Sequence, residues 1–364
     1  MKSSRFARHC AGLLLGLSLA PLAPAQLSHN LSIGNPVALA MGNSITAAIR
    51  GPDAIHYNPA ALALVENRYE QYKVQGAFFH HEGEVSGAGP GRTFDPMSNA
   101  DFLDDPLLEG KTSRPVEVET PSVYLPFFGH SPLPFLIAPG YGFALRGGTQ
   151  DQFVFANSAF AVQIFGYERD MDNVAAFNGQ RFGITRLAYF NPSIGFQLAE
   201  NLYIGGSIGF SWQGLGVTTR TRSVLNTVGE LSALLGNLES QLGLGLDLNP
   251  NPYNDVGVLE VEAEDPLSTA FTVGLLWQPR EWLSIGAAYQ SEGKVRMTGD
   301  YSLTYTEAFQ ELMQGLQPAQ SVLGIFDGGT ISGVGKQTGS VAIDFIQPQW
   351  ASLGISMLVT RTGG

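Results

Sequence analysis

The chain has 364 residues, of which 32 are acidic and 20 basic, so its formal charge is −12. This charge argues against nucleic acid as a partner, because an acidic chain repels phosphates. Charged residues make up only 14% of the chain, against about 25% in a typical soluble domain, so much of the surface is expected to face something other than water.

The first 25 residues have the pattern of a secretory signal. Three basic residues precede an apolar run at 11–20, and Ala23-Pro24-Ala25 offers a small-x-small cleavage pattern. We expect cleavage after Ala25, which leaves 17 basic residues against 32 acidic ones, a formal charge of −15. The expected location is the outer membrane, reached through this cleavable signal.

The cysteine count excludes several kinds of chemistry. Cys10, the only cysteine, lies inside the expected signal, so the mature chain is predicted to lack disulfides, thiol catalysis and cysteine metal sites. No later stretch supplies the ~20 apolar residues that a transmembrane helix needs. An exported chain of this composition then meets lipid through a transmembrane β-barrel.

Residues 34–64 follow the signal and are dominated by small side chains, which allow close backbone packing. Pro36, Pro52 and Pro59 stop any long helix. The stretch therefore predicts short helical pieces that pack inside another structure. We expect a signal at 1–25, an N-terminal plug at 26–66 and a barrel at 67–364.

Strands are expected where apolar residues alternate with small or polar ones. In 201–213, Leu202, Ile204 and Ile208 share one face, while Gly205, Ser207 and other small or polar residues share the other. The same alternation recurs in 269–277, 283–289 and 353–359. One face is predicted to meet lipid and the other a lumen.

A charged row distinguishes the stretch 294–303. Lys294, Arg296 and Asp300 alternate with Val295 and Met297. Arg or Lys on the lipid side costs about 2–4 kcal/mol at the bilayer midplane. We therefore expect the charged row to face the lumen and the apolar row to face lipid.

Less regular strands are expected at 69–81, 116–128, 137–147 and 186–198, which gives about nine strands in all. Short turns at 198–202 and 278–282 contrast with long loops at 84–115, 148–180, 222–264 and 305–338. Short turns at one rim and long loops at the other are typical of an outer-membrane barrel.

Two motifs carry a family resemblance. The run from Asp53-Ala54 through Asn58-Pro59-Ala60 to Leu62 resembles the Asp-Ala-x-x-x-x-Asn-Pro-Ala-x-Leu signature in the N-terminal hatch of the FadL-type (OMPP1/FadL/TodX) outer-membrane transporters. A second match runs through Gln278-Pro279, Leu283-Ser284-Ile285-Gly286 and Tyr289-Gln290-Ser291 to Gly299-Asp300.

The resemblance implies an all-β fold, a transmembrane antiparallel β-barrel with an N-terminal helical plug, and uptake of long-chain fatty acids or hydrocarbons by passive diffusion. It implies plug residues Asp53, Asn58, Pro59 and Ala60, no cofactor, and a monomer in outer-membrane lipid. It also implies that a plug rearrangement lets substrate leave sideways through the wall. The family closes its barrel with about fourteen strands, so about nine strands lead us to expect a truncated chain.

Two loop stretches carry apolar residues at helical spacing. We expect amphipathic helices there, and the resemblance implies an outer groove in which hydrophobic substrate first lands. The alternative is that these faces simply pack on the loops beneath them. The groove residues are Leu225, Val228, Leu231, Leu235, Leu238, Phe309, Leu312, Met313 and Leu316.

No catalytic constellation is found. The six histidines form no His-Glu-x-x-His pair, and no Gly-x-Ser-x-Gly elbow accompanies them. A barrel-borne lipid hydrolase and a structural or adhesive barrel remain alternatives. The histidine pattern argues against the first and the N-terminal plug against the second. The substrate, the inner pocket and the exit site stay open.

Overall fold

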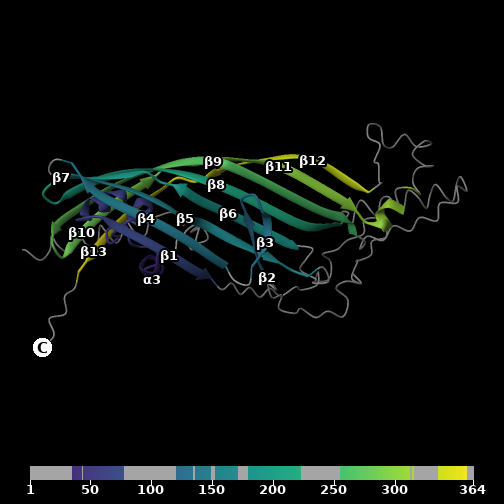
Figure 1. Ribbon diagram of the computed structural model, residues 1–364, viewed down its shortest axis with the longest axis horizontal. Coiled ribbons are helices and arrows are strands. Elements are labelled where there is room, and N and C mark those ends of the chain that lie inside the picture. Colours follow the sequence, from purple (N-terminus) through teal and green to yellow (C-terminus); the bar gives the residue numbers. More distant parts are fainter. Residues whose placement is uncertain are drawn as a thin grey trace, which may run out of the picture.

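The computed structural model describes residues 35–42, 44–77, 120–133, 136–148, 152–170, 179–222, 255–311, 314 and 335–358. Its strands form one antiparallel sheet of long, nearly aligned strands (Figure 1). This confirms the expected fold class. Among the described residues, no helix has the length and apolar character to cross a membrane.

Thirteen strands make up the sheet, which is here called the wall. They are β1 (Tyr69–Ala77), β2 (Thr120–Leu125), β3 (Gly129–Pro132), β4 (Leu136–Gly147), β5 (Phe153–Glu168), β6 (Arg181–Phe190), β7 (Ser193–Ala199), β8 (Leu202–Arg222), β9 (Asp255–Arg280), β10 (Leu283–Gln290), β11 (Gly293–Tyr305), β12 (Lys336–Gln347) and β13 (Trp350–Met357).

The main path through the wall is β1-β4-β5-β6-β8-β9-β10-β13. Two strands, β10 and β11, pair with different parts of the long strand β9. β10 pairs with the part of β9 from Thr272 to Arg280, and β11 pairs with the part from Gly257 to Glu264. The strands β2 and β3 form a hairpin that joins the wall where β2 pairs with β5.

The expected loop at 148–180 was wrong, because it contains β5, a strand of 16 residues. Its sequence, FVFANSAFAVQIFGYE, has apolar residues on both faces, and a bulge lies between Ala161 and Gln163. Each feature hides the period-two pattern. The expected loops at 222–264 and 305–338 were too long, since β9 begins at Asp255 and β12 at Lys336.

The N-terminal segment, residues 35–42 and 44–66, packs against one face of the wall, here called the inner face. It contains the short helices α3 (Pro36–Ala40) and α4 (Ala54–Tyr57) and the 3-10 helix η1 (Pro59–Leu64). Figure 1 shows them beside the end of the sheet where β10 and β13 lie. Ile45, Ile55 and Leu62 join wall residues such as Val154 and Leu276 in one buried core.

The opposite, outer face is apolar at this end of the wall. On β9, Phe271, Val273, Leu275 and Trp277 are exposed, whereas Thr272, Gly274 and Leu276 are buried. The alternation expected for 269–277 is therefore confirmed, and the apolar row points away from the N-terminal segment.

The expected orientation of the charged row on 294–303 was wrong. Val295 and Met297 are only 2% exposed and pack with Ala263, whereas Lys294 and Arg296 are exposed. The buried positions are even-numbered in β10 and odd-numbered in β11. The change occurs at the break between the two strands, Ser291 and Glu292, which a period-two pattern read within one strand cannot reveal.

The strand β8 shows which face this apolar cluster occupies. β8 runs unbroken from Leu202 to Arg222, so its odd-numbered residues share one face. Ser207 donates its hydroxyl to the carbonyl oxygen of Ile55 in the N-terminal segment, at 3.1 Å. Leu215, on the same face, packs against the Ala263 cluster. The cluster is therefore on the inner face.

The β2–β3 hairpin lies on the outer face. A Cβ atom added at Gly216 would lie 2.1 Å from His130, and one at Gly214 would lie 2.4 Å from Tyr124. These even-numbered positions of β8 point away from the N-terminal segment. Of the expected strand at 116–128, residues 120–125 form β2, one arm of a hairpin that crosses the outside of the wall, and residues 126–128 form its turn; residues 116–119 lie outside the described residues.

Candidate functional site

Asn58 connects the N-terminal segment to the wall. It is fully buried (0% exposed). Its Nδ2 atom donates to the carbonyl oxygens of Thr46 (2.8 Å) and Leu275 (3.1 Å), and its Oδ1 atom accepts from the backbone N–H of Ala60 (3.2 Å). Asn58 therefore caps η1, whose first residue is Pro59, and fixes it to β9.

Asp53 and Thr46 attach the same segment to the two ends of the wall. Asp53 accepts from Asn35 at 2.7 Å and forms an ion pair with Lys73 of β1. The hydroxyls of Thr46 and Ser352, the latter on β13, lie 2.9 Å apart. The structure thus brings the sequence-predicted residues Asp53, Asn58, Pro59 and Ala60 together in one buried segment; a plug role for them stays a prediction.

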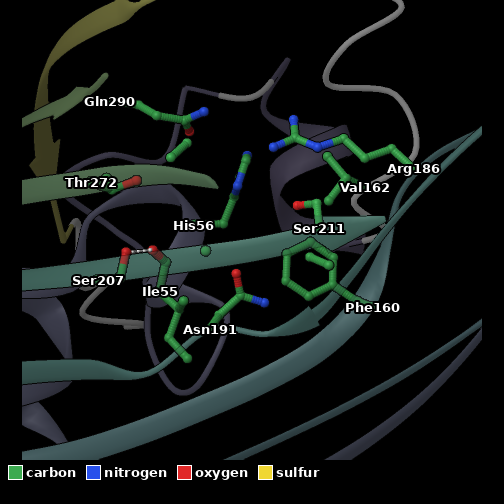
Figure 2. A pocket seen from close by; sticks show the side chains of 13 residues that line it. Ile55, His56, Phe160, Val162, Arg186, Asn191, Ser207, Ser211, Thr272 and Gln290 are labelled. Atoms are coloured by element: carbon green, nitrogen blue, oxygen red, sulfur yellow. Dashed lines mark hydrogen bonds between the residues drawn. The ribbon is translucent and has the colours of Figure 1, made fainter. Parts of the chain in front are cut away.

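A pocket lies between α4 and the inner face (Figure 2). Its cavity volume is about 30 Å³, roughly that of one water molecule, so it has room for a small polar group only. Most of its polar side chains come from different strands, so sequence reasoning did not find it. The lining residues that carry side-chain polar atoms are His56, Arg186, Asn191, Ser207, Ser211, Thr272 and Gln290.

Arg186 is the unusual member of this lining. It is 6% exposed, and its Nε atom is buried without a hydrogen-bond partner in the part of the chain that the structure describes. None of the residues lining the pocket is acidic. Figure 2 shows the guanidinium extending from β6 toward His56. A buried charge without a partner costs several kcal/mol, so it marks a candidate binding position.

Other polar groups of the pocket already have partners. Asn191 donates its Nδ2 to the carbonyl oxygen of Ser158 at 2.8 Å, and Ser207 bonds to Ile55, as the dashed line in Figure 2 shows. These bonds fix the lining in place. The pocket is therefore a preformed polar site with one buried guanidinium whose Nε atom has no partner among the described residues.

An apolar patch continues from the pocket along the inner face. Leu215 follows the pocket residue Ser211 by four positions on the same face of β8, about 13 Å at 3.3 Å per residue. The patch consists of Leu215, Ala263, Val295, Met297, Val341, Ile343 and Phe345. Pocket and patch together offer one polar end and one apolar end.

Most of the predicted loop groove lies outside the described residues, namely Leu225, Val228, Leu231, Leu235, Leu238, Leu312, Met313 and Leu316. Residues 307–311 are helical. The ring of Phe309 stacks on Tyr305 at 5.3 Å, and its backbone N–H donates to the hydroxyl of Thr306 at 3.3 Å. For Phe309 this contact agrees with packing on the neighbouring strand.

The described residues contain no group of three or more metal-ligating side chains. Glu260, Glu262 and Asp300 line a second, acidic pocket on the outer face. Glu260 accepts from Ser302 at 3.0 Å and lies 3.8 Å from Arg181. These contacts with a hydroxyl and a guanidinium account for Glu260 without a metal ion.

Comparisons with known proteins point to one family. The family model of the outer membrane protein transport protein (OMPP1/FadL/TodX) matches residues 14–360. A crystal structure of a Pseudomonas aeruginosa FadL homologue aligns with a TM-score of 0.51 at 16% identity, covering 88% of this chain and 64% of that one. This likeness supports the fold.

Two hydrocarbon channels align less well. The CymD monoaromatic hydrocarbon channel gives a TM-score of 0.48 at 14% identity, covering 89% of this chain and 65% of that one. The Pseudomonas putida toluene transporter TodX gives 0.45 at 14% identity, with 86% and 64% covered. The chain thus spans slightly less than two thirds of these structures. No curated protein sequence matches it.

Proposed function

Because this chain belongs to the OMPP1/FadL/TodX family of outer membrane transport proteins, we propose that it forms the wall of an outer-membrane channel for hydrophobic small molecules. The N-terminal segment, in this proposal, is the plug of that channel. Its close contacts with β9 and with both ends of the wall support this role.

We propose further that the solute is amphipathic and carries an acidic group. The observation that carries this is Arg186, a buried guanidinium without an Nε partner in a pocket with no acidic lining residue. A guanidinium forms paired hydrogen bonds with a carboxylate. The acid would satisfy Arg186, and its apolar tail would follow the inner face toward the apolar patch.

The plug must move before such a solute can pass. Ile55 and His56 of α4 line the pocket, so a solute held there touches the plug directly. Binding could then be coupled to movement of α4, provided that the solute favours the displaced arrangement. Passage needs no cofactor and no chemical step.

The test compares Arg186→Met with Arg186→Lys in the full-length protein in vesicles. Hydrogen bonds to a charged group contribute about 1.5–3 kcal/mol, so Arg186→Met should weaken oleate binding by roughly tenfold to a hundredfold. Hexadecane binding should stay nearly unchanged, because it has no acidic group. Arg186→Lys should restore part of the oleate affinity.

Arg296→Met is the matched control, since Arg296 is exposed on the outer face. It should leave binding of both ligands unchanged. Equal loss of oleate and hexadecane binding in Arg186→Met would contradict the acid-binding role. Binding of neither ligand by the unaltered protein would contradict the proposed channel function itself.

A further inference from the structure

The β2–β3 hairpin has no part in the proposed transport route, because it lies on the outer face of the wall. It crosses several strands, as Figure 1 shows. A Cβ atom added at Gly166 of β5 would lie 1.8 Å from the carbonyl oxygen of Ser122, and one at Gly129 would lie 3.4 Å from Glu262 of β9. The hairpin therefore runs from β5 toward β9, with its turn on the β9 side.

Contacts with the wall hold the hairpin in place. Tyr124 is buried, and its ring stacks on that of Trp212 at 6.2 Å with an interplanar angle of 4°. Glu264 accepts hydrogen bonds from the hydroxyl of Tyr124 (3.3 Å) and from Nε1 of Trp212 (3.1 Å). These contacts fix the strands of the hairpin on the wall and so fix the position of its turn.

The turn itself exposes two phenylalanines. Phe127 is 97% exposed and Phe128 is 78% exposed. Phe127 has a φ of 67°, a conformation that bulky residues rarely adopt. Two adjacent aromatic side chains that are this exposed are unfavourable in water, so we expect a less polar environment to surround them.

The position of the turn along the wall indicates that this environment is the edge of the lipid bilayer. On the outer face of β9, the exposed apolar row includes Leu267, Phe271 and Val273. Farther along the same face of β9, beyond Leu267, lie Glu264, Glu262 and Glu260, which are close to the hairpin and the acidic pocket. A change from apolar to charged side chains marks the edge of the bilayer, where aromatic side chains gather.

We propose that the β2–β3 hairpin is an interfacial membrane anchor, with Phe127 and Phe128 inserted into the lipid next to the wall. The partner is membrane lipid, and the turn lies beside Glu262, just beyond the end of the exposed apolar row of β9. The anchor requires that the wall spans a membrane, but it does not depend on which solute the channel carries.

The test places a nitroxide at Phe128→Cys in the mature protein, which has no other cysteine after the expected cleavage, reconstituted in phosphatidylethanolamine/phosphatidylglycerol vesicles. Accessibility to oxygen, which concentrates in lipid, is compared with accessibility to a water-soluble nickel complex. The label should favour oxygen, as should a label at Ile208→Cys on the exposed apolar face. A label at Glu281→Cys, an exposed position in the short turn between β9 and β10, should favour nickel.

Two results would overturn the anchor. Preferential nickel access at residue 128 would place the turn in water. Low access of both reagents would mean that protein covers the turn. Protease resistance of each labelled protein confirms folding, and Phe127→Cys provides a second label site if Phe128→Cys fails to fold.

Discussion

Single glycines of the wall decide how closely the N-terminal segment can approach. A Cβ atom added at Gly274 would lie 2.0 Å from Oδ1 of Asn58, and one at Gly205 would lie 2.3 Å from the carbonyl oxygen of Pro59. Any side chain larger than hydrogen would displace the segment at these two positions. The wall is thus fitted to the Asn58-Pro59 turn at the level of single atoms.

The first prediction concerns Gly274→Ala. The added methyl group should push Asn58 away from β9 and weaken its bond to Leu275, at a cost of about 1–3 kcal/mol for overpacking. If the N-terminal segment is the plug of the channel, as proposed above, vesicles that contain the variant should release trapped carboxyfluorescein faster than vesicles with the unaltered protein.

Gly206→Ala is the control for this prediction. It lies on a neighbouring strand, and the nearest atom to its added Cβ would be 3.7 Å away, an ordinary contact. Its dye release should equal that of the unaltered protein. Equal release from the two variants would show that the Asn58 contact does not control closure.

At the scale of elements, the break between β10 and β11 changes which residues face inward: even-numbered residues are buried in β10 and odd-numbered residues in β11. Before it, Ser284 and Gly286 are buried; after it, Val295 and Met297 are buried. This change brings apolar residues to the inner face beyond the pocket. It also moves Lys294 and Arg296 to the outer face, where water can solvate them.

The next prediction compares Val295→Asp with Arg296→Asp. An aspartate at 295 would enter the apolar patch without a partner, so the variant should unfold at lower urea concentration, with a loss of several kcal/mol. An aspartate at 296 stays exposed and removes only a surface pair with Asp344, so it should change stability by at most about 1 kcal/mol.

Urea titration in detergent, followed by tryptophan fluorescence, measures both variants. The alternation of the sequence predicts the same order, because it places residue 295 in lipid and residue 296 in a polar lumen, so the titration tests the burial of Val295 and not the face on which it lies. A larger loss for Arg296→Asp than for Val295→Asp would contradict the burial of Val295 in the apolar patch.

At the scale of the whole molecule, the N-terminal segment links parts of the wall that do not pair with each other. In the described residues β1 and β13 are hydrogen-bonded to β4 and β10 respectively, but not to one another. The Lys73–Asp53 pair reaches β1, and Thr46 reaches Ser352 on β13. The N-terminal segment therefore connects the first and last strands of the main path, which do not pair with each other.

The last prediction is that the mature protein begins at Gln26 and fractionates with the outer membrane. Its basis is the Ala23-Pro24-Ala25 pattern together with the family assignment. N-terminal sequencing of the membrane fraction measures it. Ala25→Asp should block cleavage and retain the signal, and a cytosolic chain with Met1 intact would contradict the prediction.

The sequence by itself determined the fold class and the family. Regular alternation in 202–213 and 269–277 is a local property, and so is the Asn58-Pro59 motif. Each can be read without knowing what lies across the sheet. The sequence also indicated the short helical pieces, because Pro36, Pro52 and Pro59 act within their own turns.

Only the tertiary structure decided which face of each strand is the inner one. Alternation shows that two faces differ, but a bulge in β5 and the break before β11 shift the pattern by one residue. The pocket around Arg186 and the outer position of the hairpin combine residues far apart in the chain. They depend on register between strands, which no single stretch of sequence contains.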